Sequence, residues 1–138
     1  MKLQILREGQ EKIDNYEHVF VGENQIDISH VVSNECEQIL ATDILDAFSL
    51  NAIPELINAI SSKLRMGAEL CIGGTDIRLF AKAHLNGLLS NSEASELLSS
   101  LNSACSLVSV QEILQSVGLS VVDTHMNGVH FEIKARRV

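Results

Sequence analysis

Short apolar stretches separated by polar connections fill the first third of the sequence, a pattern typical of β-strands. Lys2–Leu6, His18–Val21 and Glu37–Thr42 have strand character. Gln25–Val32 alternates apolar and polar residues and is predicted as one more strand. This part of the chain is therefore expected to contribute strands rather than helices.

From residue 54 the spacing of the apolar residues becomes helical. Pro54 suits the first turn of a helix and Gly67 suits the position after its end, so a helix is predicted between them. Its inward face holds Leu56, Ile57, Ile60 and Leu64. Glu69–Gly73 is then predicted as a compact strand, after which Gly73-Gly74 lets the chain turn into the next helix. Neither a Walker pattern nor a full GxGxxG is present, so these glycines do not indicate a phosphate loop.

Further helices are predicted before the end of the chain. One runs over 76–88 with Thr75 as its cap, and another covers 92–101. The last begins at Ser109, because Ser109 and Glu112 match a capping box in which a hydroxyl and a carboxylate bind free backbone N–H groups. It is expected to end at the next glycine.

The strongest local signal is Asn127-Gly128, which separates the segments Ser120–Met126 and Val129–Arg136. This dipeptide tolerates the positive φ angles of a two-residue hairpin turn. Strands that alternate with helices and end in an antiparallel hairpin predict an α/β fold, a mostly parallel twisted sheet with helices on both faces. No repeat, proline-rich linker or charge block divides the sequence, so residues 1–138 are expected to form a single domain.

Composition narrows the range of partners and compartments. The chain has 18 acidic residues against 10 Lys and Arg, a formal net charge of −8. Such a surface repels phosphate backbones, which argues against nucleic acid as a partner. No apolar run reaches the length of a membrane span and the start lacks the apolar core of a signal peptide, so a cytoplasmic protein without membrane contact is expected. Three widely spaced cysteines in apolar sequence, Cys36, Cys71 and Cys105, are predicted to be buried free thiols.

The order of elements, with the hairpin last, resembles the class I S-adenosylmethionine (SAM) dependent methyltransferases, and several stretches are similar to a compact subgroup that begins at the cofactor motif. Lys2–Gly9 (KLQILREG) stands where that subgroup has Lys-Leu-Asn-Leu-Gly-Cys-Gly. Asn15–Val21, Glu37–Phe48 and Lys63–Asp76 resemble the segments that follow, and Leu114–Arg137 is similar to the closing helix and hairpin. The likeness covers nearly the whole chain and implies a Rossmann-like fold of the SAM-methyltransferase type.

The sequence departs from the family where the resemblance places the cofactor. In the family, two glycines after the first strand let the backbone approach SAM. Here Leu6 and Glu8 stand at those positions with Arg7 between them. If the register of this turn shifts, Gly9 could restore one close approach of the backbone to SAM, but not both. The family has an acidic residue at the end of the second strand to bind the ribose hydroxyls, and Phe20 stands there instead. The resemblance thus implies a SAM site whose main binding groups have been lost.

The segment after the strand at 37–42 departs in the same way. Asp43, Asp46 and Ala47 replace a His, a Glu and a His of the subgroup. Two carboxylates at the carboxyl end of a parallel strand could tune each other's proton affinity for acid–base work. Equally, Asp43 could cap the following segment while Asp46 faces water.

A two-residue Asn-Gly turn would place His125 directly opposite His130, and Asp123 opposite Glu132 on the same face. Two imidazoles at that spacing could share a metal ion, with a carboxylate completing the site. The spacing matches no established zinc signature, however, so the favoured interpretation is that these are polar residues on the wetter face of an edge hairpin, without a metal.

Three functional hypotheses follow. In the first, a methyltransferase-like protein has lost productive SAM binding, uses no cofactor, and acts as a binding or interaction module for a protein or a small molecule, with a homo-oligomer as a further possibility. In the second, it is a divergent but active SAM-dependent methyltransferase on a small acceptor, and a shifted loop holds SAM through Gly9 and Glu23. In the third, Arg7, Glu8 and the Asp43 region bind another small ligand or a metal, although Arg7 and Glu8 equally suit an exposed loop.

Overall fold

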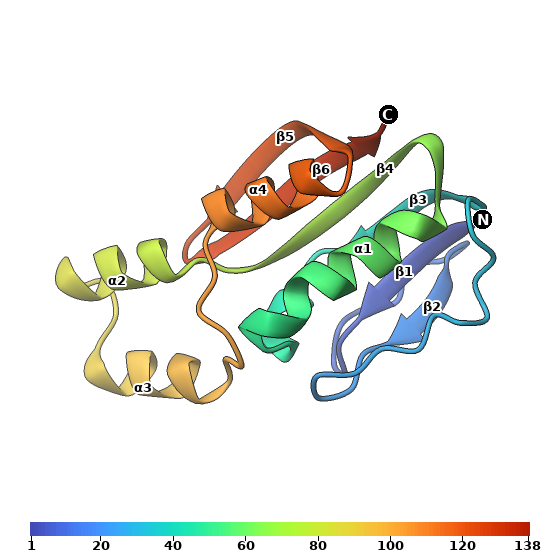
Figure 1. Ribbon diagram of the computed structural model, residues 1–138. Helices are drawn as coiled ribbons and strands as arrows, with labels where there is room; N and C mark the ends of the chain where they lie inside the picture. Colours follow the sequence, from blue (N-terminus) through green and yellow to red (C-terminus); the bar gives the residue numbers. More distant parts are fainter.

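The computed structural model describes residues 1–138, and its strands form one mixed sheet in the order β2-β1-β3-β4-β6-β5 (Figure 1). The strands are β1 (Lys2–Leu6), β2 (Glu17–Phe20), β3 (Cys36–Ala41), β4 (Leu64–Thr75), β5 (Leu119–Asn127) and β6 (His130–Arg137). The first four are parallel to one another, whereas β6 is antiparallel to β4 and to β5. The predicted Rossmann-like sheet with its C-terminal antiparallel hairpin is therefore confirmed.

Four α-helices and two 3-10 turns connect the strands: α1 (Ile53–Lys63), α2 (Ile77–Leu85), α3 (Asn91–Ser99), α4 (Leu107–Ser116), η1 (Leu45–Ala47) and η2 (Leu50–Ala52). Helices α1 and α4 contact each other and lie against the same face of the sheet (Figure 1). Helices α2 and α3 form a hairpin that extends beyond the carboxyl end of β4. The helical layer on the sheet therefore consists of α1 and α4.

The hydrophobic core lies between this helical layer and the sheet. Alternate residues of the strands point into it, and the inward face of α1 meets them, so that Leu3, Ile39, Leu70, Ile57 and Ile60 are fully buried. Burial of one such aliphatic side chain contributes about 1.5–3 kcal/mol. The predicted helix after Pro54 is confirmed with Leu56, Ile57 and Ile60 buried, and Pro54 stands in its first turn. Its predicted end was wrong, because Leu64 is the first residue of β4 and Gly67 lies inside that strand.

The opposite face of the sheet carries polar side chains and is crossed by the segment 7–16, which contains no helix, whereas helices were expected on both faces. Gln4 points to this face and clamps the segment there, donating a hydrogen bond to the carbonyl of Glu11 and accepting one from the N–H of Ile13. The hydroxyl of Tyr16 donates to Gln38 on β3 at 2.7 Å. These bonds hold the chain after β1 in an extended path.

The segment Gln25–Val32 is not a strand, so that prediction was wrong. It belongs to the connection between β2 and β3, where Ile28 and Val31 are buried in the core and the N–H of Val31 donates to the carbonyl of Ile28 in a tight turn. Its alternating apolar residues anchor a loop. No strand lies beyond β2, which is the edge of the sheet, so the segment has no ladder to join.

Two helix starts also differ from the prediction. Asp76 rather than Thr75 caps α2, accepting hydrogen bonds from the N–H groups of Arg78 and Leu79. The capping box of α4 is formed by Ser106 and Ser109, so Ser109 lies one turn inside the position predicted for it. A hydroxyl at this third helical position can close the box as a carboxylate does, because it also accepts a backbone N–H.

The hairpin is shifted relative to the predicted register. Asn127 pairs with His130 and His125 pairs with Glu132, so Gly128 and Val129 form the turn. Gly128 has a φ of +62°, and the carbonyl of Val129 accepts the N–H of Asp76, which fixes the turn against the end of β4. The predicted direct pair of His125 and His130 is therefore wrong, and with it the matching pair of Asp123 and Glu132.

Gly73 and Gly74 lie inside β4 instead of serving as its exit. A Cβ at Gly73 would stand 2.2 Å from the carbonyl oxygen of Phe131 and 2.6 Å from that of Thr42. At Gly74 it would meet the Cβ of Leu45 at 2.9 Å. Glycine is required at both positions because β6, the turn after β3 and η1 approach β4 too closely for any side chain.

Candidate functional site

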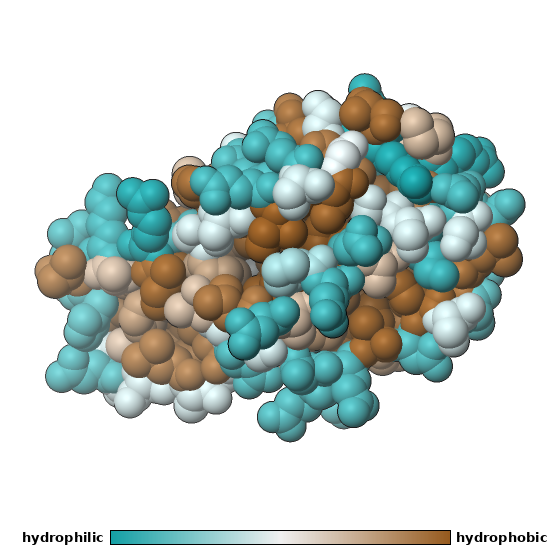
Figure 2. Space-filling model, viewed as in Figure 1, coloured by the Kyte–Doolittle hydropathy of each residue, from teal (hydrophilic) through white to brown (hydrophobic).

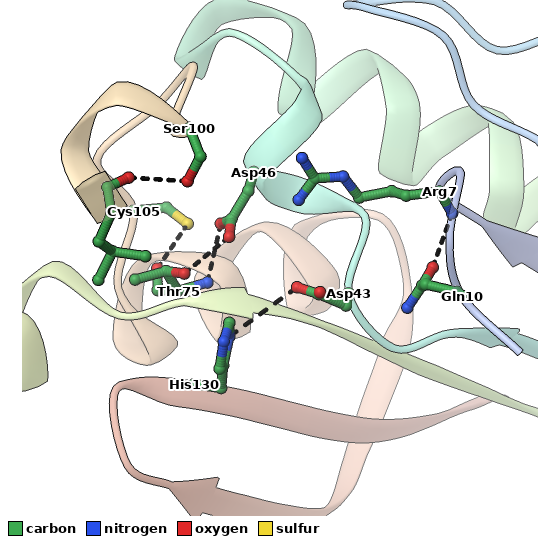
Figure 3. Close-up of polar contacts among 9 residues, drawn as sticks. Arg7, Gln10, Asp43, Asp46, Thr75, Ser100, Cys105 and His130 are labelled. Atoms are coloured by element: carbon green, nitrogen blue, oxygen red, sulfur yellow. Dashed lines mark hydrogen bonds and ion pairs between the residues drawn. The ribbon is translucent and has the colours of Figure 1, made fainter. Parts of the chain in front are cut away.

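The carboxyl ends of the parallel strands meet at one edge of the sheet, the region where open α/β sheets bind ligands. Arg7 and Glu8 follow β1 at this edge, Glu23 lies shortly after β2, and Asp43 follows β3. His130 joins them because β6 is antiparallel and begins beside the end of β4. Figure 3 shows the Arg7 side chain extending from its turn toward Asp46, with Asp43 and His130 facing each other.

The turn after β1 is closed by its own residues. The N–H of Arg7 donates to Oε1 of Gln10 at 2.6 Å, and the N–H of Gln10 donates to the carbonyl of Arg7 at 3.1 Å. Gly9 supplies the φ of +90° that the turn needs. No helix begins after this turn, because the chain continues over the polar face of the sheet to Glu17. The N–H groups of a helix N-terminus, which would suit an anionic ligand, are therefore missing at this position.

Arg7 and Glu8 line an open cavity of about 400 Å³, called here the polar hollow. Glu23 comes from the loop after β2, and the end of α3 and the segment after it contribute Ser99, Ser100 and Asn102. Asn102 is fixed there because its N–H donates to the carbonyl of Asp46 and its side chain donates to the carbonyl of Ala47. Only two of the nine lining residues are hydrophobic, so the cavity suits a small polar ligand better than an aromatic ring.

The remaining positions that match the family site lie elsewhere. Leu6 is 1% exposed and points to the polar face of the sheet, outside the main core. Gly9 has open space where a Cβ would stand. Phe20 is 49% exposed at the edge of the sheet, with the ammonium group of Lys12 lying 5.2 Å from its ring centre. Asp43 lines a different cavity, so the six positions do not form one pocket.

Asp43 and His130 face each other in a second cavity of about 370 Å³, which Glu132 and His125 also line. Oδ1 of Asp43 lies 3.8 Å from Nδ1 of His130, too far for a hydrogen bond, and has no other partner. Burial raises the pKa of Asp43 and outweighs the opposing effect of His130, while Asp46 raises that pKa further. The structure thus brings together Asp43, Asp46 and one of the two histidines that the sequence suggested.

Asp43, Asp46 and His130 are also the group whose spacing could hold a metal ion, since their ligand atoms lie within 4.8 Å of one another. Asp46 is already engaged, because Oδ1 accepts the N–H of Thr75 at 2.8 Å and Oδ2 accepts its hydroxyl at 2.6 Å. This leaves Asp43 and His130 as the free donors, fewer than a structural metal site requires. His125 stands opposite Glu132, outside this group.

Sequence reasoning missed Gln10 and Asp76 at this edge, and it did not predict that Asp46 is buried. Gln10 closes the first turn, and Asp46 joins the segment after β3 to the end of β4. The carboxylate of Asp76 binds two helix starts at once, since its second oxygen accepts the N–H of Leu107 at 2.8 Å. Asp76 follows the predicted strand at 69–73 and precedes a helical pattern. This position between a strand and a helix was the signal in the sequence for a helix cap. Nothing in the sequence indicates the partner of Gln10.

The cysteines are free, with Cys36 and Cys105 buried and Cys71 half-buried. Burial, followed by the charge of Glu132, raises the pKa of Cys71 to about 11. Burial, followed by the charges of Asp46 and Asp76, raises the pKa of Cys105 to about 11 as well. Both thiols are therefore protonated at neutral pH and are poor nucleophiles.

Comparison with solved structures identifies the class of fold. An O-methyltransferase family protein from Burkholderia thailandensis superposes with a TM-score of 0.63 at 15% identity, covering 88% of this chain and 36% of that one. A SAM-dependent methyltransferase from Archaeoglobus fulgidus gives 0.62 at 8% identity, covering 89% and 68%. One from Aquifex aeolicus gives 0.56 at 17% identity, covering 91% and 56%.

The fold is thus of the class I SAM-dependent methyltransferase type, as the resemblance implied. This chain spans only between about one third and two thirds of the length of those three proteins. No protein-family model matches the sequence, and no curated protein matches it. None of the helices combines the length and the apolar character that crossing a bilayer demands.

Proposed function

We propose that this chain is a methyltransferase-like domain that no longer binds SAM productively and that acts as a binding module for a polar small molecule or a protein. The observation that carries the proposal is the closed turn after β1. The backbone N–H of Arg7 is bound by Gln10, and the chain then passes over the sheet instead of starting a helix. A ligand at this place would meet a satisfied turn rather than free N–H groups.

The side chains around the turn support the same conclusion. Leu6 and Glu8 stand where the resemblance implies glycines, and the side chain of Phe20 has no atom that could accept a hydrogen bond from a ribose hydroxyl. The adenine ring of SAM would need an apolar slot, which the polar hollow does not offer. The neighbouring apolar cavity, lined by Phe20, Ile26 and Phe48, shares only Gly22 with it. A ligand that fits the lining of the polar hollow is small and carries charged or hydroxyl groups.

The alternative is a divergent active methyltransferase on a small acceptor. One observation favours it: Glu23 lines the same cavity as Arg7 and Glu8, at the carboxyl ends of β1 and β2. A carboxylate in that place could bind ribose hydroxyls, as the acidic residue does in related folds. The formal charge of −8 favours an acceptor other than nucleic acid.

Isothermal titration with SAM and with S-adenosylhomocysteine tests the proposal. We expect no saturable binding to the wild-type chain up to about 1 mM, which corresponds to a binding free energy weaker than about −4 kcal/mol. Saturable binding in the micromolar range would refute loss of SAM binding and would support the active methyltransferase. Gln10→Ala frees the N–H of Arg7 and tests whether the closed turn is the obstacle, with the exposed Gln115→Ala on α4 as the matched control.

A further inference from the structure

The hairpin of α2 and α3 is supported by very little of the rest of the domain. These two helices contact mainly each other, and within them only Phe80 and Ala94 are buried. Each helix has nine residues, which is below the length at which a helix is stable in water without packing. The hairpin therefore lacks the burial that usually stabilises helices of this length.

The same hairpin carries the two large apolar side chains that are most exposed in the molecule. Leu85 is 84% exposed, Leu88 in the connecting turn is 74% exposed, and Leu98 on α3 is 51% exposed. Figure 2 shows hydrophobic surface over α2 and α3. Exposed leucines at the tip of a projecting element, here Leu85 and Leu88, are typical of an interaction surface.

Charge is separated between the two helices. α2 carries Arg78 and Lys82 and no acidic residue, whereas α3 carries Glu93 and Glu96 and no basic residue. All four side chains are exposed, and the ion pairs of the structure involve none of them. The basic face of α2 is therefore free to meet an acidic helix, and α3 is such a helix.

We infer that two copies of this chain associate through their α2–α3 hairpins, with α2 of each copy lying against α3 of the other. A two-fold axis makes such a contact self-complementary, because each α2–α3 contact occurs twice. The two positive and two negative charges of α2 and α3 cancel, whereas the whole chain has a formal charge of −8. Because its net charge is zero, the α2–α3 hairpin is a region where two copies of the acidic chain can meet without strong like-charge repulsion.

This arrangement places Leu85 and Leu88 of both copies near the contact and pairs Lys82 with an acidic side chain of the partner copy. The arrangement does not depend on whether SAM binds. Its tests measure molecular mass, so their failure is distinct from failure of the proposed function.

Sedimentation equilibrium of the full chain over a concentration series is the first test. We expect the weight-average mass to rise from that of a monomer to that of a dimer. Lys82→Glu and Glu96→Lys should each weaken this association about tenfold, since like charges then oppose each other across both contacts. Arg65→Glu, an exposed site on β4 with the same change in charge as Lys82→Glu, should have little effect.

Mixing the two variants is the decisive experiment. In a mixed dimer, the carboxylate introduced by Lys82→Glu in one copy would face the ammonium group introduced by Glu96→Lys in the other. At the second contact, the native Lys82 would face the native Glu96. An equimolar mixture should therefore associate within about threefold of the wild type, although each variant alone does not. Rescue of this kind between two chains cannot arise from an effect on folding within one chain.

A wild-type chain that stays monomeric to about 1 mM would overturn the inference. The inference would also be overturned if Lys82→Glu and Glu96→Lys associated as strongly as the Arg65→Glu control. The contact would then lie on another surface. Leu88→Ser covers the case in which a charge variant fails to fold. Its site lies in the turn between the helices, and it should weaken association at least tenfold while circular dichroism stays that of the wild type.

Discussion

The carboxylate of Asp46 accepts two hydrogen bonds from Thr75, one from the backbone N–H at 2.8 Å and one from the hydroxyl at 2.6 Å. Both residues are almost fully buried. The pair joins the turn after β3 to the last residue of β4, and so fixes the carboxyl edge on which Asp43 and His130 lie (Figure 3). A buried carboxylate of this kind is stabilising only while its partners are present.

Thr75→Val tests this link with little change of shape. The substitution leaves Oδ2 of Asp46 buried without its hydroxyl donor, and we expect the free energy of unfolding to fall by about 1–3 kcal/mol. Urea denaturation followed by circular dichroism measures the change. Thr124→Val, at an exposed position on β5, is the control and should be nearly neutral. Equal stability of the two variants would show that the bond to Asp46 contributes nothing.

Gly73→Ala tests the close packing inside the sheet. The new methyl group would overlap the carbonyl oxygens of Phe131 and Thr42, so β4 must move away from β6 and from the turn after β3. We expect a loss of about 3 kcal/mol or failure to fold. Gly22→Ala is the matched control, because a Cβ there has only the Cβ of Gln25 at 3.9 Å. Differential scanning calorimetry should show a much lower Tm for Gly73→Ala than for Gly22→Ala.

The sequence was most informative where a local pattern also determines the packing. Lys2–Leu6 is a strand with the predicted bounds, and the apolar face after Pro54 packs into the core as α1. In both cases the period of the apolar residues matches the element that buries them. The order of such elements was enough to identify the fold.

The predictions that were wrong depend on contacts between distant residues. The hairpin register is fixed by the bond of Asp76 to Val129, which a local Asn-Gly preference does not include. The alternating segment Gln25–Val32 had the pattern of a strand but no neighbour with which to pair. At the site, the bond between Arg7 and Gln10 and the approach of His130 to Asp43 arise only from the folded path of the chain.

The raised pKa of Asp43 predicts a pH dependence of stability. Because burial favours the neutral form, the folded state holds this proton more tightly than the unfolded state does. The protonated carboxyl of Asp43 therefore stabilises the folded state fully below the ordinary pKa of 3.8. This stabilisation is lost as the pH rises through the pKa that Asp43 has in the folded state. Asp43→Asn removes the ionisation, so its stability relative to the wild type should increase as the pH rises above about 4.

Urea denaturation of Asp43→Asn and the wild type at several pH values, from about pH 3 to pH 7, measures this difference. Asp14→Asn, in the exposed segment that crosses the sheet, controls for the loss of one negative charge. A difference between Asp43→Asn and the wild type that stays constant with pH would contradict the prediction. A difference that falls with rising pH would mean that the attraction of His130 outweighs burial.

Thiol reactivity provides the last prediction. A pKa of about 11 in place of the ordinary 9.0 lowers the thiolate fraction of Cys71 and Cys105 about 100-fold at pH 8. Both thiols should therefore react with iodoacetamide at least about 100-fold more slowly in the folded chain than in urea. Peptide mapping by mass spectrometry measures each rate. Glu132→Gln removes a negative charge next to Cys71 and should increase its rate severalfold, while Cys105, whose raised pKa arises from burial, Asp46 and Asp76, serves as the internal control. If both cysteines accelerate together, the variant has loosened the fold; if neither does, the carboxylate of Glu132 does not influence the Cys71 thiol.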